Sequence, residues 1–130
     1  MNRFFLLAGS AMGAVAVILG AFGAHALKAR LSPDQLQVFD TGVRYQMYHS
    51  LALILLFAIG KNGSSLLNYS GYLFLAGILL FSGSVYLLSC NEILGLQKMK
   101  SVLGPITPLG GLCFISGWVC LFLAALRFKN

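Results

Sequence analysis

The sequence predicts an all-α integral membrane protein: a four-helix bundle with an interfacial amphipathic helix that leads into the second spanning helix. Hydrophobic residues make up 58% of the 130 residues and charged residues only 9%, against about 45–50% and about 25% in an ordinary soluble domain. Four apolar stretches also approach the roughly 20 residues that a helix needs to cross a bilayer. We therefore expect one transmembrane domain, residues 1–130, with helices at about 4–26, 33–60, 67–89 and 108–126.

The first apolar stretch follows Arg3 and ends near Ala24-His25-Ala26, which has the form of a signal-peptide cleavage site. Its apolar run is longer than the 7–15 residues or so of a secretory signal. We therefore expect it to remain in the protein as a spanning helix.

The start of the second helix is marked by Ser32 as N-cap, Pro33 in the first turn and Gln35 three residues after the cap. Apolar residues then recur at steps of three and four: Leu36, Phe39, Val43 and Met47. We expect the segment from Ser32 to Arg44 to lie along the membrane interface before the chain turns inward. Asp40 and Arg44 are four residues apart and can form an ion pair on its wetter face.

Glycine, asparagine and serine over residues 61–65 predict a tight turn before the third helix. A longer connection runs from Cys90 to the fourth helix. There we expect Thr107 to be the N-cap and Pro108 to open the helix.

The formal charge of +6 is scattered in short breaks between the apolar runs. This pattern is typical of interfacial anchors that face lipid headgroups and not of a nucleic-acid footprint. The basic residues of the two sides do not fix the orientation, because one side would hold Arg3, Lys61, Arg127 and Lys129 and the other Lys28, Arg30, Arg44, Lys98 and Lys100. We expect a multi-pass protein of a bacterial inner membrane whose partners are lipids and not nucleic acid.

Small residues form candidate helix seams, since close backbone approach drives helix association in lipid. The candidate packing glycines are Gly9, Gly13, Gly20, Gly83 and Gly117. Such seams either close the bundle itself or join it to another copy or a larger membrane complex.

Ionisable groups at membrane depth are energetically costly, so they usually have a hydrogen-bond or ion-pair partner or a functional role. We expect a polar cluster near one interface, formed by His25, Tyr45, Tyr48, His49 and Tyr86. Three interpretations are open: hydrogen bonds that hold the helices in register, a solute- or proton-handling site, or bis-histidine haem ligation by His25 and His49. The absence of a carboxylate at membrane depth weakens the case for a proton-coupled transporter.

The sequence carries no GxSxG, HExxH or phosphate-loop motif, so we expect no enzymatic activity. Cys90, Cys113 and Cys120 lie in or beside apolar segments without a CxxC spacing, which favours a packing role. We predict no metal and no cofactor, with haem as the alternative.

Four blocks of the sequence carry a resemblance to a known family that extends over essentially the whole chain. They are Gly20-Ala21-Phe22-Gly23-Ala24-His25-Ala26-Leu27, Phe39-x-Thr41-Gly42-x-x-Tyr45-Gln46-x-Tyr48-His49-x-Leu51-Ala52-Leu53, Ser82-Gly83-Ser84-x-Tyr86, and Pro105-x-Thr107-Pro108-x-Gly110-Gly111 followed by Gly117-Trp118. With these blocks the chain resembles the small four-pass membrane proteins of domain of unknown function 423, whose eukaryotic relative is transmembrane protein 256. The resemblance implies a compact four-helix membrane protein and no particular activity.

The function we expect is that of a non-enzymatic accessory or assembly subunit that acts through helix packing. The alternatives are a small-solute or proton permease that uses the histidine and tyrosine cluster, and a haem-binding membrane subunit.

Overall fold

A computed structural model describes residues 3–61 and 63–129, and over these residues the chain is helical with short connections. The elements are α1 (Phe4–Phe22), the π-helical turn η1 (Gly23–Leu27), α2 (Pro33–Ile59), α3 (Ser65–Gly77), the π-helical turn η2 (Ile78–Ser82), α4 (Gly83–Ser89), the short α5 (Asn91–Leu94), the 3₁₀ turn η3 (Gln97–Met99) and α6 (Lys100–Ala125). Four stretches are long and apolar enough to cross a membrane: Phe4–Leu27, Pro33–Ile59, Ser65–Ser89 and Gln97–Ala125. The predicted four-span helical fold is therefore confirmed.

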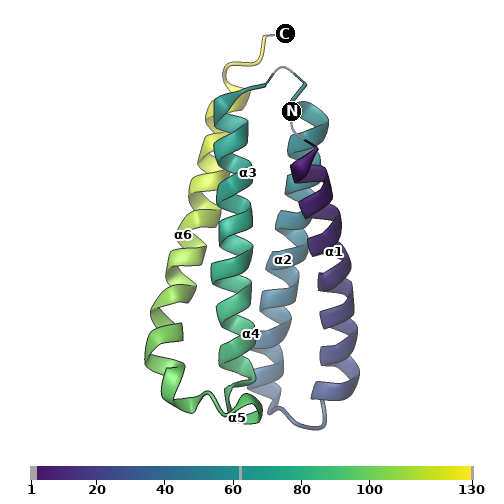
Figure 1. The fold of residues 1–130 in the computed structure, drawn as a ribbon, viewed down its shortest axis with the longest axis vertical. Coiled ribbons are helices and arrows are strands. Elements are labelled where there is room, and N and C mark those ends of the chain that lie inside the picture. Colours follow the sequence, from purple (N-terminus) through teal and green to yellow (C-terminus); the bar gives the residue numbers. More distant parts are fainter. Residues whose placement is uncertain (1–2, 62, 130) are drawn as a thin grey trace.

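The helices run up and down, so that both ends of the chain lie at one end of the bundle and α5 lies at the other (Figure 1). Helix α1 packs on α2, α2 packs on α3 and α4, and these two pack on α6. The outer spans are the less buried ones. In the most apolar 18 residues of each span, 17% are buried in the first and fourth spans and 39% in the second and third. The second and third spans therefore form the centre of the bundle.

Glycines allow α1 and α2 to approach closely. A Cβ added at Gly9 would lie 2.8 Å from the carbonyl oxygen of Ser50, and one added at Gly23 would lie 2.9 Å from the Phe39 ring. Because real Cβ atoms do not approach other heavy atoms so closely, larger side chains at these positions would push the helices apart.

The predicted N-cap of α2 is present. The Gln35 backbone N–H donates to Ser32 Oγ (3.2 Å) and the Ser32 N–H donates to Gln35 Oε1 (3.0 Å), which completes a capping box. Arg44 Nε also donates to Asp40 Oδ2 at 2.8 Å, on an exposed face.

The segment from Ser32 to Arg44 does not form a separate interfacial helix. From Pro33 onward it is the first half of α2, which continues without interruption to Ile59. The apolar stripe that suggested an interfacial position packs inside the bundle: Phe39 is 4% exposed and clusters with Leu27, Leu31 and Cys90. Protein, and not the headgroup region, covers this face.

Helix α6 begins at Lys100, earlier than Thr107, and contains both Pro105 and Pro108. The Thr107 hydroxyl does not cap the helix. It forms a 2.6 Å hydrogen bond with the Ser84 hydroxyl of α4. A proline inside a helix removes one backbone donor and crowds the carbonyl four residues earlier, but spanning helices tolerate it where neighbouring helices satisfy the freed backbone groups.

Candidate functional site

A group of polar and aromatic side chains surrounds the buried His49, in the second half of α2. The Trp118 indole N–H of α6 donates to His49 Nε2 across 3.0 Å. Because an indole nitrogen is only a donor, Nε2 accepts, and the ring proton is on Nδ1. His49 Nδ1 then donates to the Tyr45 carbonyl oxygen one turn earlier, at 2.7 Å. Both imidazole nitrogens are therefore used in one neutral tautomer.

Aromatic rings enclose this imidazole. It stacks on Phe114 of α6 with ring centroids 3.6 Å apart and planes 11° apart, and Phe74 of α3 lies 5.3 Å away. Gly77 makes room for the Phe114 ring, since a Cβ there would overlap it, and Gly117 does the same for Phe74. The His49 aromatic cluster, by which we mean His49, Tyr45, Phe74, Phe81, Phe114 and Trp118, thus joins α2, α3, η2 and α6.

A second buried polar group, one turn away on α2, is centred on Gln46, which is only 2% exposed. Gln46 Nε2 donates to the Met12 carbonyl oxygen of α1 at 2.8 Å. The Tyr86 hydroxyl of α4 donates to Gln46 Oε1 at 2.6 Å. One amide side chain therefore connects three helices.

Gln46 was not among the residues of the predicted polar cluster. The missed signal is its spacing: Gln46 shares the inward stripe of α2 with Phe39, Gly42, His49, Leu53 and Leu56, all of which are buried. A polar side chain on the apolar stripe of a spanning helix predicts an interhelical hydrogen bond, because it is buried and needs a partner there. A polar side chain beside the stripe can be solvated and makes no such prediction.

Serine hydroxyls connect further pairs of helices. Ser82 donates to the Gly42 carbonyl oxygen and Ser70 to the Gly117 carbonyl oxygen, each at 2.8 Å. Among the described residues, every buried side-chain nitrogen or oxygen has a hydrogen-bond partner. The polar interior is therefore satisfied by the protein itself.

The predicted cluster of histidines and tyrosines is divided between separate places. Tyr86 pairs with Gln46, and Tyr48 is 54% exposed on the outside of α2. Tyr45 is 40% exposed but stays beside His49, with ring centroids 6.1 Å apart. His25 lies exposed in η1 at the end of the bundle that carries α5. Gly23 lies against Phe39 of the antiparallel α2, so His25 is level with about residue 37 of α2. At about 1.5 Å per residue, His25 is therefore about 18 Å from His49 along the helix axis.

This separation bears on the haem alternative. A bis-histidine site needs two imidazole nitrogens aimed at one iron from facing helices, and here the two rings are far apart and His49 Nε2 accepts from Trp118. Over residues 3–61 and 63–129, no group of three or more His, Cys, Asp or Glu side chains is placed to hold a metal ion.

The predicted packing glycines fall into two sets. Gly9, Gly20 and Gly117 lie against neighbouring helices, and Gly13 is in ordinary contact with Ser50. Gly83 differs, because a Cβ at this position would meet nothing within 4 Å. No side chain of the described residues packs against the Cβ position of Gly83.

Comparison with known proteins agrees with this architecture. A family model described as "Protein of unknown function (DUF423)" matches residues 19–111. The chain is 41% identical over 128 residues to a UPF0382 membrane protein of Staphylococcus aureus (strain bovine RF122 / ET3-1), covering 98% of this chain and 99% of that protein. It is 43% identical over 128 residues to the UPF0382 membrane protein YwdK of Bacillus subtilis (strain 168), covering 97% and 98%. No solved structure matches the chain.

Proposed function

We propose that this chain, which belongs to the DUF423 family of bacterial multi-pass membrane proteins, is a non-enzymatic accessory subunit that associates with other membrane helices. Its interior supports a structural role for the polar residues, because their hydrogen bonds are directed at one another and at backbone carbonyls. The candidate contact surface lies on the outside of the bundle.

The observation that carries the proposal is a set of outward glycines. A Cβ at Gly83, Gly104 or Gly111 would meet no heavy atom within 4 Å. Gly104 and Gly111 are seven residues apart and therefore lie on one face of α6. Glycine on the outside of a spanning helix gives nothing to the packing of its own bundle, but it allows another helix to come close.

The proposal is tested by blue-native electrophoresis after extraction in mild detergent. We expect the parent protein to migrate in a complex larger than its monomer. The double variant Gly104→Leu/Gly111→Leu should migrate as the monomer without a lower thermal unfolding midpoint, because an added Cβ meets no heavy atom within 4 Å at either position and leucine favours the helix.

Ser116→Leu serves as the control, because it adds a bulky apolar side chain at an exposed position of α6 away from the two glycines. It should leave the complex intact. A monomer of the parent protein at every expression level would contradict an accessory role.

A further inference from the structure

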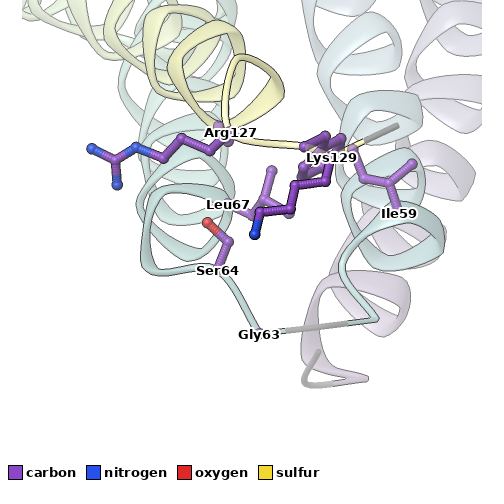
Figure 2. A pocket seen from close by; sticks show the side chains of 8 residues that line it. Ile59, Gly63, Ser64, Leu67, Arg127 and Lys129 are labelled. Carbon is purple, nitrogen blue, oxygen red and sulfur yellow. The ribbon is translucent and has the colours of Figure 1, made fainter.

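A cavity of about 510 Å³ opens at the end of the bundle that carries both chain ends. It lies where α2 ends, α3 begins and the chain leaves α6. Its walls combine apolar and basic side chains, among them Ile59, Ser64, Leu67, Arg127, Phe128 and Lys129. Figure 2 shows the Lys129 ammonium group directed toward Ser64, and the Arg127 guanidinium extending outward from the rim.

The charge at this end of the bundle is all of one sign among the described residues. Its ionisable side chains are Arg3, Lys61, Arg127 and Lys129, whereas Asp34, Asp40 and Glu92 lie toward the opposite end. The one ion pair formed by the described residues joins Asp40 to Arg44. The basic groups at the cavity therefore have no carboxylate partner within the part of the chain that the structure describes.

The position of the cavity also restricts its ligand. It lies at the ends of three spanning segments, where the hydrocarbon core of a bilayer gives way to the headgroups. Its volume is within the roughly 300–1,000 Å³ of small-molecule pockets. Basic pockets between spanning helices bind anionic lipid headgroups in other membrane proteins.

We propose that this basic cavity binds one anionic phospholipid. Lys129 and Arg127 would contact the phosphodiester, and the apolar wall of Ile59, Leu67 and Phe128 would contact the glycerol and the first methylene groups. A lipid supplies both an anion and an apolar stem, which is the combination that the walls of the cavity match, whereas free phosphate supplies only the anion.

The test uses the full-length protein in uncharged detergent, with bound lipid counted by native mass spectrometry. We expect the parent protein to bind dioleoyl phosphatidylglycerol in preference to dioleoyl phosphatidylcholine, and inorganic phosphate not to compete at the same concentration. Arg127→Gln/Lys129→Gln should weaken phosphatidylglycerol binding about 30-fold, because each basic residue near an anionic lipid contributes about 1 kcal/mol and 1.4 kcal/mol corresponds to tenfold.

Arg3→Gln/Lys61→Gln is the matched control. It removes the same charge from the same end of the bundle, but from residues outside the cavity wall. Retained affinity in this control supports a localised site, and an equal loss in the two double variants would overturn it in favour of diffuse attraction. The proposal is also overturned if Arg127→Gln/Lys129→Gln binds phosphatidylglycerol as the parent does, or if inorganic phosphate displaces the lipid.

Discussion

Trp118 donates its indole proton to His49 across 3.0 Å, and this contact joins α6 to the second half of α2. The donor and acceptor of this hydrogen bond are fixed, because the indole has no acceptor and the imidazole has a single acceptor nitrogen in this tautomer. The Phe114 ring stacked on the imidazole holds it in the plane that this contact needs.

Replacing His49 by phenylalanine should remove the acceptor and retain the ring stack. We expect the free energy of unfolding to fall by about 0.6–1.7 kcal/mol, which is from the average to the maximum of interhelical hydrogen bonds in a membrane protein. Titration with sodium dodecyl sulfate in mixed micelles measures this change. The protein has a single tryptophan, so its one indole N–H resonance should move upfield in His49→Phe, and an unmoved resonance would contradict the contact.

The Gln46 and Tyr86 side chains should be energetically coupled. Tyr86→Phe removes one donor, and Gln46→Leu removes both of the interhelical bonds that the amide makes. A double-mutant cycle measured by reversible unfolding should give a coupling energy of about 0.6 kcal/mol or more. Tyr72→Phe is a control at an exposed tyrosine of α3, and its coupling to Gln46→Leu should be zero.

Two adjacent glycines of α6 should respond oppositely to alanine. The Cβ of Gly110→Ala would collide with the backbone of Phe81, which cannot rotate away, whereas that of Gly111→Ala meets nothing within 4 Å. We expect Gly110→Ala to lose about 1–3 kcal/mol of unfolding free energy, as overpacked sites do, and Gly111→Ala to be neutral or slightly stabilising. Equal effects of the two substitutions would contradict this packing of α6 on η2.

The Cys90 thiol should react slowly with maleimides. It lies just after α4, and its burial raises the pKa of the thiol, which lowers the thiolate fraction at pH 8. With Cys113 and Cys120 replaced by serine, we expect Cys90 to be alkylated more slowly than a cysteine placed at the exposed position Lys98 in a cysteine-free chain. The rate should rise with pH past the ordinary thiol range, and denaturation should abolish the difference.

The number of spans and the start of α2 were predictable because their signals are local, whereas the start of the fourth helix at Lys100 was missed. A run of apolar residues predicts a spanning helix wherever it occurs, and the Ser32 to Gln35 spacing determines the capping box within one turn. Local signals also predicted the Asp40 and Arg44 pair.

The positions of Thr107 and Phe39 depend on neighbours that no local pattern specifies. Thr107 has the sequence context of an N-cap, yet its hydroxyl pairs with Ser84, which is distant in sequence. Phe39 lies on an amphipathic stripe that suits an interface equally well, and the contacts with Gly23 and Tyr86 place it inside. The prediction placed His25 and His49 near one interface, but it did not account for how far His49 lies from the start of α2.

The π-helical turn η2 sets the angular phase of the third span. Ser70, before the turn, donates a hydrogen bond to α6, whereas Ser82, the last residue of the turn, and Tyr86, after it, donate to α2. Loss of one residue between Ile78 and Ser82 would rotate the rest of the span by about 100°. The Tyr86 hydroxyl would then point away from the Gln46 amide, although the span would remain apolar. Homologous chains should therefore tolerate many substitutions in this turn but no change in its length.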